Sequence, residues 1–565
     1  MDEEEKINSL VSTCLFRYRL LSYLLFISFL LVGCNQMGSV SGVVVDDQGL
    51  PVPGATVGVQ ASGSFVQADA TGMFTITGLS PGKPVTISAW KDLYYCAKQE
   101  NVQPPSRNVR LVLRLYQTGD NPQYAWVAPT GENSCYSCKP GVTQVWLDND
   151  AHGKSTTNPR FLSMYYGTDL QGHQSPLTRY SHGDYGTAPI PPDLTQPYYG
   201  PGYKLDFPNA SGNCATCHIP GAALDDPYNT DPNRVQGVNL FGIHCDFCHK
   251  IAAVRLDSST GLPALNQPGV LSLDVRRPFP EDKDRYQLFF GTFIDDNVPQ
   301  EDTNLPLLAQ SRFCAPCHYG AFWDTIVYDS YGEWLRSPYS DPQTGKTCQN
   351  CHMPSPTLLD GKPMTNVAPG KGGVERYPGA IHAHTFPGAA NQELLQNALS
   401  MQVTASREGE RLLVLVTLTN DKTGHHVPTD SPLRHLILLV EATDQAGNTL
   451  SLIEGERVPE YGGVGDPRLG YYAGLPGKIY AKVLIELWTG IYPTGAYWNN
   501  TRLFSDNRLA AFASDTSQYA FSAPTTGELG VRARLFYRRA YRLLADQKGW
   551  TDADILMNLA EVVVH

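Results

Sequence analysis

The cysteines constrain this chain more than any other feature of its sequence. Ten of its 13 cysteines form five Cys-x-x-Cys pairs, and each pair is followed by a residue that can bind a metal ion. The pairs are Cys135 and Cys138, Cys214 and Cys217, Cys245 and Cys248, Cys314 and Cys317, and Cys348 and Cys351. The following residues are Lys139, His218, His249, His318 and His352, in that order.

Cys-x-x-Cys-His is the attachment motif of c-type haem, in which the thiols bond to the haem vinyl groups and the imidazole reaches the iron. Zinc sites and disulfides are the alternatives for such cysteines. Four copies of the whole motif in 565 residues favour haem. We therefore expect five covalently bound c-type haems as cofactors, with the ten cysteines as attachment points and the residue after each pair as an iron ligand.

Each haem iron also has a second axial position, and histidine is its usual donor. When the four proximal histidines, His435 and His565 are set aside, eight of the 14 histidines remain for four or five positions. They are His152, His173, His182, His244, His382, His384, His425 and His426. This surplus predicts mostly bis-histidine, electron-carrying haems, although any single histidine could instead be an ordinary surface or core residue.

Residues 135–390 resemble the multihaem cytochromes related to cytochrome c-554 and the pentahaem nitrite reductases. The stretches that carry the resemblance are "WLDNDAHGKSTTNPRF", "YGEWLRSPYSDPQTGKTCQNCHMP" and "AIHAHTFPGAAN". The resemblance implies that His152 and His384 are distal haem ligands. His244, which directly precedes a Cys-x-x-Cys-His motif, is an equally strong candidate for a distal ligand. His173 and His182, in Gly/Tyr-rich loops, are the next candidates. "TGHHVPTD" resembles a stretch of β-domains appended to such cytochromes and favours His425 as a further ligand.

Lys139 leaves three possibilities open. Its amine can bind ferric iron only when deprotonated, which desolvation and the charge of the metal favour. In the nitrite reductases that the chain resembles, a Cys-x-x-Cys-Lys motif carries the catalytic haem. Those enzymes also have an active-site histidine shortly before their Cys-x-x-Cys-His-Met-Pro motif, whereas this chain has none between His318 and His352. Lys139 is therefore a redox-tuning ligand, the mark of a catalytic haem, or no ligand.

The regions on either side of the motifs predict β-domains. Residues 34–116 alternate between polar and apolar, with Gly, Pro and Asp turns, as a β-sandwich does. Their stretch "SGVVVDDQGLPVPGATVGVQ" resembles carboxypeptidase regulatory-like domains. Residues 396–565 predict a C-terminal β-sandwich-like domain that ends in a short helix from Thr551. Residues 117–395 between them are expected to form a loop-rich, mainly α pentahaem cytochrome domain.

Residues 1–33 predict a lipoprotein signal peptide. Arg17 and Arg19 precede an apolar run that is too short to span a bilayer comfortably. The run ends in Leu-Val-Gly-Cys, which looks like a bacterial lipobox with Cys34 as the lipidated residue. An uncleaved signal anchor is the alternative. We expect an exported protein, either an outer-membrane or cell-surface lipoprotein held by its N-terminal lipid anchor or a periplasmic one.

The net charge of −12 argues against a nucleic-acid partner. The sequence favours a multihaem c-type cytochrome that relays electrons between redox protein partners in a respiratory or extracellular chain. A haem-dependent reductase of nitrite or hydroxylamine-like small substrates, acting at the Lys139 haem, is one alternative. A self-assembling subunit of an extracellular cytochrome filament is another. An electron carrier is favoured over an enzyme.

Overall fold

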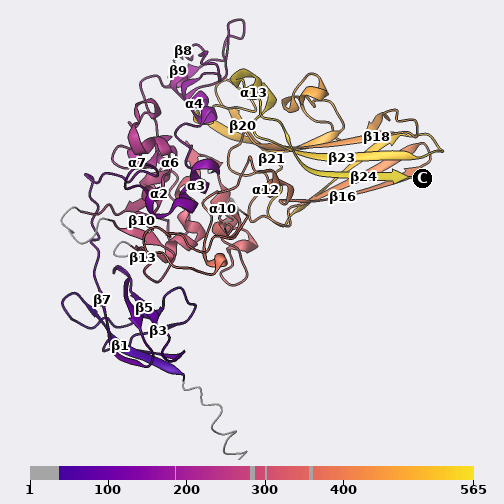
Figure 1. Ribbon diagram of the computed structural model, residues 1–565. Coiled ribbons are helices and arrows are strands. Elements are labelled where there is room, and N and C mark those ends of the chain that lie inside the picture. The colour runs from indigo at the N-terminus through magenta and orange to yellow at the C-terminus, as the bar shows by residue number, and fades with distance from the viewer. Residues whose placement is uncertain (1–36, 150, 185, 280–286, 299–301, 356–360) are drawn as a thin grey trace, which may run out of the picture. The chain divides into compact units, whose positions relative to one another are not determined.

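The computed structural model describes residues 37–149, 151–184, 186–279, 287–298, 302–355 and 361–565 (Figure 1). The expected signal peptide and Cys34 lie outside these described residues. The chain divides into two compact units, Met1–Leu115 with Ile294–Asp296, and Tyr116–Phe293 with Asn297–His565. The cysteine-rich region and the C-terminal β-region therefore belong to one unit.

The first unit is a β-sandwich-like domain, as the alternating sequence predicts. Its strands are β1 (Gly38–Asp46), β2 (Thr56–Val59), β3 (Phe65–Gln67), β4 (Met73–Leu79), β5 (Val85–Trp90), β6 (Ala97–Val102) and β7 (Ser106–Leu113). They form a sheet of order β4-β1-β7 and a second sheet of order β3-β2-β5-β6. Val40 and Val44 of β1 and Ile87 of β5 are fully buried in the core that the two sheets share. Burial of every second residue thus holds the two layers together.

The cysteine motifs of the second unit each occupy one helical turn. These turns are α2 (Cys135–Cys138), α6 (Ala215–His218), α8 (Cys245–Cys248), α9 (Ala315–His318) and α11 (Cys348–His352). Cys214 and Cys314 stand at the N-caps of α6 and α9. Because helical residues three and four apart share a face, each turn directs both thiols and the residue after them to the same side.

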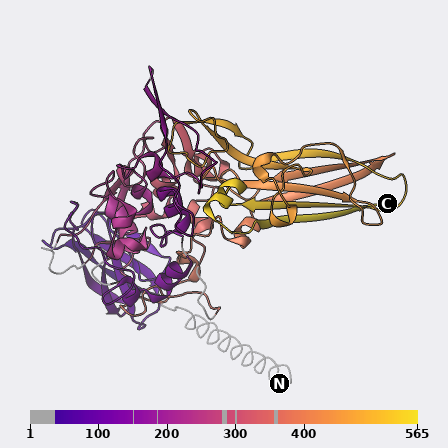
Figure 2. The same cartoon turned by 90° about the horizontal axis from the view of Figure 1, so that it is seen from above.

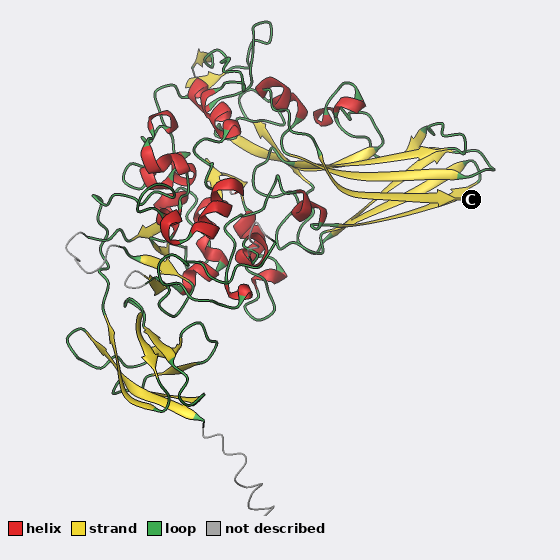
Figure 3. Ribbon diagram, viewed as in Figure 1, coloured by secondary structure: helices red, strands yellow, loops and turns green. Residues whose placement is uncertain are grey.

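The rest of the cysteine-rich region consists of short helices, 3-10 turns and four two-stranded sheets (Figure 3). The other helices are α3 (Pro140–Asn149), α4 (Pro159–Tyr166), α5 (Tyr203–Asp206), α7 (Pro220–Ala223), α10 (Ser330–Leu335) and α12 (Gln392–Gln396). The paired strands are β8 (Tyr180–Gly183) with β9 (Gly186–Pro189), β10 (Ile251–Val254) with β11 (Leu273–Val275), β12 (Phe289–Gly291) with β13 (Asp302–Asn304), and β14 (Gly320–Phe322) with β15 (Thr325–Tyr328). The loop-rich character agrees with expectation, but a mainly α domain is not supported. Gly or Pro lies at or just after the end of some of the helices, such as Gly167 after α4 and Pro354 after α11.

The C-terminal β-region is a sandwich of two antiparallel sheets, and its long strands lie side by side in both views of the chain (Figures 1 and 2). One sheet has the order β16 (Ser400–Glu408), β17 (Arg411–Thr419), β22 (Ser514–Ser522) and β19 (Leu452–Glu454). The other has the order β21 (Thr501–Asp506), β20 (Gly477–Glu486), β18 (His435–Thr443), β23 (Leu529–Arg538) and β24 (Ile555–Val564). Val414, Leu436 and Leu535 are fully buried between the sheets.

The final segment corrects one prediction. The expected helix from Thr551 is absent from the described chain, where Ile555–Val564 instead forms strand β24, paired antiparallel with β23. A helix does occur just before it, as α13 (Arg542–Lys548). The pairing extends from Leu529↔Val564 to Tyr537↔Ile555. A long partner strand overrides the weak helical preference of such a segment.

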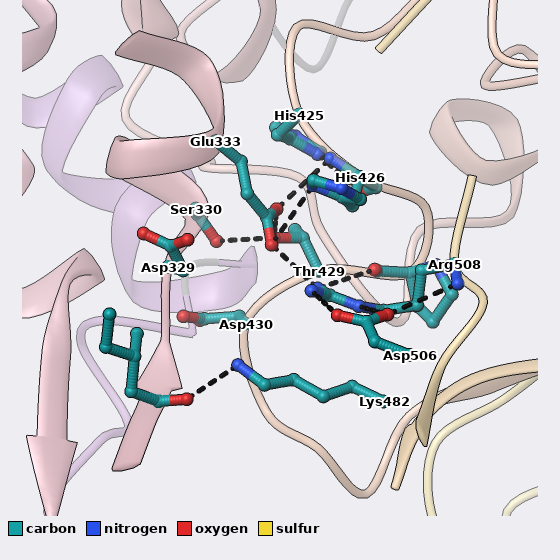
Figure 4. Close-up of polar contacts among 12 residues, drawn as sticks. Asp329, Ser330, Glu333, His425, His426, Thr429, Asp430, Lys482, Asp506 and Arg508 are labelled. Atoms are coloured by element: carbon teal, nitrogen blue, oxygen red, sulfur yellow. Dashed lines mark hydrogen bonds and ion pairs between the residues drawn. The ribbon is translucent and has the colours of Figure 1, made fainter. Parts of the chain in front are cut away.

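The contacts that attach the C-terminal β-region to the cysteine-rich region include hydrogen bonds of Trp498 and Asn499 with Asp206, and two further sets. At one, the Lys548 ammonium of α13 is fully buried and donates to the carbonyl oxygens of Ser163 (3.0 Å), Thr168 (3.1 Å) and Pro201 (2.6 Å). At the other, the loop 420–434 between β17 and β18 meets helix α10 (Figure 4). The functional site lies beside this second contact.

Candidate functional site

Four of the five cysteine motifs line one cavity of about 2360 Å³. They are the motifs of Cys135, Cys245, Cys314 and Cys348, each with its second cysteine and the following lysine or histidine. A pocket for a single small molecule occupies about 300–1,000 Å³, so this cavity has room for several large groups. The His318 side chain is 40% exposed although it lies among buried residues, because its free surface faces this internal space.

Thiols from different motifs meet one another in this region. The hydrogen-bonded pairs are Cys135 with Cys245, Cys217 with Cys317, and Cys314 with Cys348. The hydrogen bond with Cys314 lowers the pKa of the Cys348 thiol to about 7. The charge of Cys248 also acts on Cys314. The first motif therefore adjoins the third, the third adjoins the fourth, and the fourth adjoins both the second and the fifth.

Three histidines that follow cysteine pairs each face a second histidine from a distant part of the chain. The ring centres of His152 and His318 are 6.2 Å apart, those of His249 and His384 are 6.1 Å apart, and those of His352 and His425 are 6.3 Å apart. All six side chains line the cavity. The three separations agree within 0.2 Å, whereas the ring planes are inclined to each other at 58°, 33° and 20°, respectively.

Protein acceptors hold the Nδ1 atoms of these histidines. The contacts are His249 with Phe290 O (2.6 Å), His352 with Pro387 O (2.7 Å), His384 with His382 O (3.1 Å), His425 with His426 O (2.9 Å) and His318 with Asp430 Oδ2 (3.5 Å). An Nδ1–H that donates to such an acceptor leaves the Nε2 lone pair free for a metal. In these five rings the Nδ1 contact therefore leaves Nε2 as the nitrogen atom that can bind a metal.

The protonation of these rings also suits metal binding. Burial lowers the pKa of His152 and His249 to about 3 and that of His352 and His384 to about 4. Burial would also lower the pKa of His318, but its contact with the Asp430 carboxylate raises that pKa on balance. Neutral imidazoles are the form that binds metal ions, so the first four need no proton loss at neutral pH.

Lys139 lies at the same cavity but faces an aromatic ring. Its Nζ atom is 4.2 Å from the centre of the Phe289 ring, and that ring also stacks on His249 at 3.9 Å. Burial raises the pKa of the nearby Asp302 carboxyl, and the positive charge of Lys139 partly offsets this rise. The lysine therefore has a cation–π partner and an acidic neighbour at the edge of the cavity.

The motif of Cys214 is placed differently from the other four. Neither cysteine of this motif nor His218 is among the residues that line the cavity. His218 stacks on Phe161 with ring centres 3.9 Å apart, and burial lowers its pKa to about 4. The Cys217–Cys317 hydrogen bond nevertheless joins this motif to the fourth.

Three other predicted ligands lie away from the cavity lining. His244 is fully buried at the N-cap of α8, where its Nδ1 accepts from Phe247 N at 3.2 Å. His173 contacts Asp169 Oδ2 through Nδ1 at 2.7 Å, and the exposed His182 of β8 contacts Thr187. The structure brings His152, His384 and His425 to the cysteine motifs but does not bring these three to the cavity.

Three residues at the site were missed by sequence reasoning. Phe289 contacts both Lys139 and His249, Asp430 contacts His318, and Glu333 binds the loop that carries His425. Asp430 ends the "TGHHVPTD" stretch, so its position beside a predicted ligand was a usable signal. Glu333 lies in the quoted stretch "YGEWLRSPYSDPQTGKTCQNCHMP", but nothing in that stretch links its carboxylate to a distant loop. Phe289 stands in no motif.

Within the described residues, no helix is long and apolar enough to cross a bilayer.

Comparison with known proteins identifies one part of the chain. No curated protein matches the sequence. A penta-heme cytochrome c552 from Thermochromatium tepidum is 17% identical with a TM-score of 0.49, over 76% of this chain and 97% of that one. A PapD-like domain of human CEP192 is 5% identical with a TM-score of 0.13, over 30% of this chain and 84% of that one. These structural likenesses are too slight to carry an argument. Residues 39–115, in contrast, match the family model of the carboxypeptidase regulatory-like domain.

Proposed function

We propose that this chain is a multihaem c-type cytochrome that carries five haems and relays electrons. The observation that carries the proposal is the threefold repetition of facing histidines around a cavity lined by Cys-x-x-Cys thiols. When bound, each haem supplies an iron that takes up and releases one electron. The chain supplies the attachment thiols, the axial ligands and a shared space that excludes bulk water.

The separation of the rings supports this proposal quantitatively. A metal–imidazole bond of about 2.0–2.1 Å, with the nitrogen about 1.1 Å from the ring centre, puts two opposed rings about 6.2 Å apart. The three pairs have separations of 6.1, 6.2 and 6.3 Å. Ordinary ring pairs also occur at such distances, as for Tyr203 and Trp498 at 6.2 Å, so the separations support the proposal through their place beside the cysteine motifs.

The pairs assign three distal ligands within the proposal. His318 and His152 would hold the haem attached to Cys314 and Cys317. His249 and His384 would hold the haem on Cys245 and Cys248. His352 and His425 would hold the haem on Cys348 and Cys351. With both axial positions filled by protein, none of these three sites offers a position for a substrate, which favours electron transfer over catalysis there.

Contacts between motifs support a connected path for electrons. The thiol pairs join the first motif to the third and join the fourth to the second and the fifth. Attachment points that touch bring the edges of the attached groups close together. The proposed order is a line through the first, third, fourth and fifth sites, with the second as a branch at the fourth.

A reductase at the first motif is the second candidate. Its supporting observation is that Lys139 has Phe289 and Asp302 as neighbours at the cavity, rather than a facing histidine ring like those of the three pairs. A small substrate such as nitrite or hydroxylamine would need an open axial position there. Nitrite-dependent reoxidation of the reduced protein, lost in Lys139→His, would favour this second candidate over a simple relay.

The test uses protein matured in a host that attaches c-type haem. We expect a pyridine haemochrome assay and intact mass to report five haems per chain. His152→Ala and His384→Ala should each convert one low-spin haem to high-spin in the electron paramagnetic resonance spectrum. His565→Ala, at an exposed histidine that pairs with Glu528, is the control and should leave the spectrum unchanged. Absence of haem, or variants identical to wild type, would overturn the proposal.

We further propose that the protein works outside the cytoplasm, anchored by lipid at Cys34 and coupled to a redox protein partner. The sequence of the first 34 residues supports this location, because an apolar run ends in a lipobox-like Leu-Val-Gly-Cys. Labelled palmitate should be incorporated into the wild-type protein and not into Cys34→Ala. A labelled Cys34→Ala protein would contradict the anchor.

A further inference from the structure

The loop 420–434 carries two residues that act on different cavity sites. His425 faces His352, with ring centres 6.3 Å apart, and Asp430 Oδ2 lies 3.5 Å from His318 Nδ1. The segment between them belongs to no helix or strand. An irregular segment loses backbone freedom when it is fixed, at about 1–2 kcal/mol per residue. Contacts elsewhere must therefore hold both side chains in place.

Glu333 of α10 supplies those contacts (Figure 4). Its side chain is 1% exposed and accepts hydrogen bonds from His426 N at 3.1 Å and from the Thr429 hydroxyl. His426 Nδ1 also lies 3.3 Å from the carboxylate. His426 and Thr429 both stand between His425 and Asp430, so one carboxylate binds the loop at two points inside the segment that matters.

The charge of Glu333 is itself compensated. Arg508 Nη1 donates to it at 2.7 Å, and the same guanidinium donates to the carbonyl of Pro428 at 3.3 Å. Burial alone would raise the pKa of Glu333, but contacts with His426, Arg508 and Thr429 lower it to about 2. The carboxylate is therefore charged at neutral pH, and a buried charge that loses its partners is strongly destabilising.

The backbone of the loop shows that it is held rather than relaxed. Asp430 has φ +67°, in the left-handed region that only Gly, Asn and Asp adopt readily. His425 O accepts from the Asn420 side chain at 2.8 Å, which fixes the other end of the segment. The Glu333 carboxylate, Arg508 and Asn420 thus define the path of the chain between the two functional side chains.

We propose that Glu333 is a positioning residue that sets two axial ligands at once, by fixing His425 opposite His352 and Asp430 against His318. This inference rests on the proposed function, since it concerns ligands of the proposed haems. Helix α10, which itself carries no cysteine or histidine, would then help to position residues of both the fourth and the fifth proposed haem sites. The C-terminal β-region would also be part of the redox centre, because the loop belongs to that region.

The test compares variants of the full haem-loaded protein. Glu333→Ala should keep five haems by the pyridine haemochrome assay but convert one of them from low-spin to high-spin. Its spectrum should match that of His425→Ala, and Glu333→Gln, which keeps one acceptor oxygen, should convert a smaller fraction. Asp329→Asn is the matched control, because this carboxylate precedes the same helix and pairs with Arg336 rather than with the loop.

Each outcome decides one point. Glu333→Ala and Glu333→Gln spectra that both equal the Asp329→Asn spectrum would overturn the positioning role. If His425→Ala also leaves every haem low-spin, the ligand assignment within the proposed function fails instead. If Glu333→Ala does not accumulate, Glu333→Gln carries the test, and its unchanged low-spin signal would overturn the inference. A chain without haem would remove the proposed function itself.

Discussion

The cysteine-rich region, residues 117–395, and the C-terminal β-region, residues 396–565, are held together in different ways. The β-region has one continuous apolar core of 23 buried residues between two sheets of long strands. The largest core cluster centred in the cysteine-rich region has eight buried residues, and the ligand side chains surround a cavity of about 2360 Å³. One region is stabilised by its own side chains, whereas the other surrounds an internal space that the haems of the proposed function would fill.

The largest effect should come from removing an attachment point in the cysteine-rich region. Cys314→Ser with Cys317→Ser removes the motif that contacts the second and fifth motifs. We expect the haem count to fall from five to four and the region 116–395 to become more sensitive to protease. A protease pattern identical to wild type would show that this region keeps its fold without the fourth haem.

A core substitution in the β-region should lower the stability of the protein without changing its haem content. Leu436 is fully buried in the core between the sheets. Leu436→Ala should lower the free energy of unfolding by about 2–5 kcal/mol. The haem count and the low-spin signal of the native protein should not change. Chemical denaturation measures the free energy of unfolding, and absorption spectroscopy measures the haem content and spin state. A loss of haem in Leu436→Ala would contradict the view that the β-region is stabilised independently of haem.

Replacing the buried Lys548, which contacts both regions, should lower the free energy of unfolding by a moderate amount. Lys548→Met leaves three carbonyl oxygens without their donor, at a cost of about 1–3 kcal/mol near neutral pH. Burial lowers the pKa of Lys548 to about 7, below the value of about 10.4 in an unfolded chain.

The pH dependence of that variant follows from the direction of the shift. Between about pH 7 and pH 10 the unfolded chain holds more protons on Lys548 than the folded one, so the folded state gains stability as pH rises. The free energy of unfolding of wild type, relative to that of Lys548→Met, should therefore increase as the pH rises over this range. A difference that stays flat would mean that the three carbonyls keep the ammonium charged.

The smallest change in stability is expected from a substitution at the surface of the β-region. Arg532 and Glu561 form an ion pair at 2.7 Å, but their side chains are 57% and 56% exposed. Exposed pairs contribute little because water and salt screen them, so Arg532→Ala should change stability by less than about 1 kcal/mol. A larger loss, measured by thermal unfolding, would mean that the β-region depends on more than its apolar core.

The sequence predicts well those features that consecutive residues encode. The five motifs, the strand alternation of the first unit and the loop-rich character of the middle region all follow from local patterns. Residues 551–565 show the limit, because the expected helix became strand β24 once β23 provided a partner. Local preference could not anticipate that pairing, which joins segments about 20–35 residues apart in the chain.

The candidate site shows the same limit more sharply. Family resemblance singled out His152, His384 and His425, yet their partners His318, His249 and His352 follow from the three-dimensional fold and from no spacing in the sequence. Local placement also favoured His244, whose Nδ1 caps helix α8, and its role as a ligand stays a prediction. Glu333 lies in a stretch that carries the family resemblance, but its contact with a loop some 90 residues further along the chain could not be read from that stretch.

The contacts between thiols of separate motifs have a consequence for how the molecule is assembled. Cys135, Cys217 and Cys314 each touch a cysteine from another motif. Outside the cytoplasm, neighbouring thiols are readily oxidised to disulfides. A polypeptide that collapsed first would therefore crosslink one motif to the next and block its own loading. Within the proposed function, this geometry would require the thioether bonds to form on an open chain, before the polypeptide becomes compact.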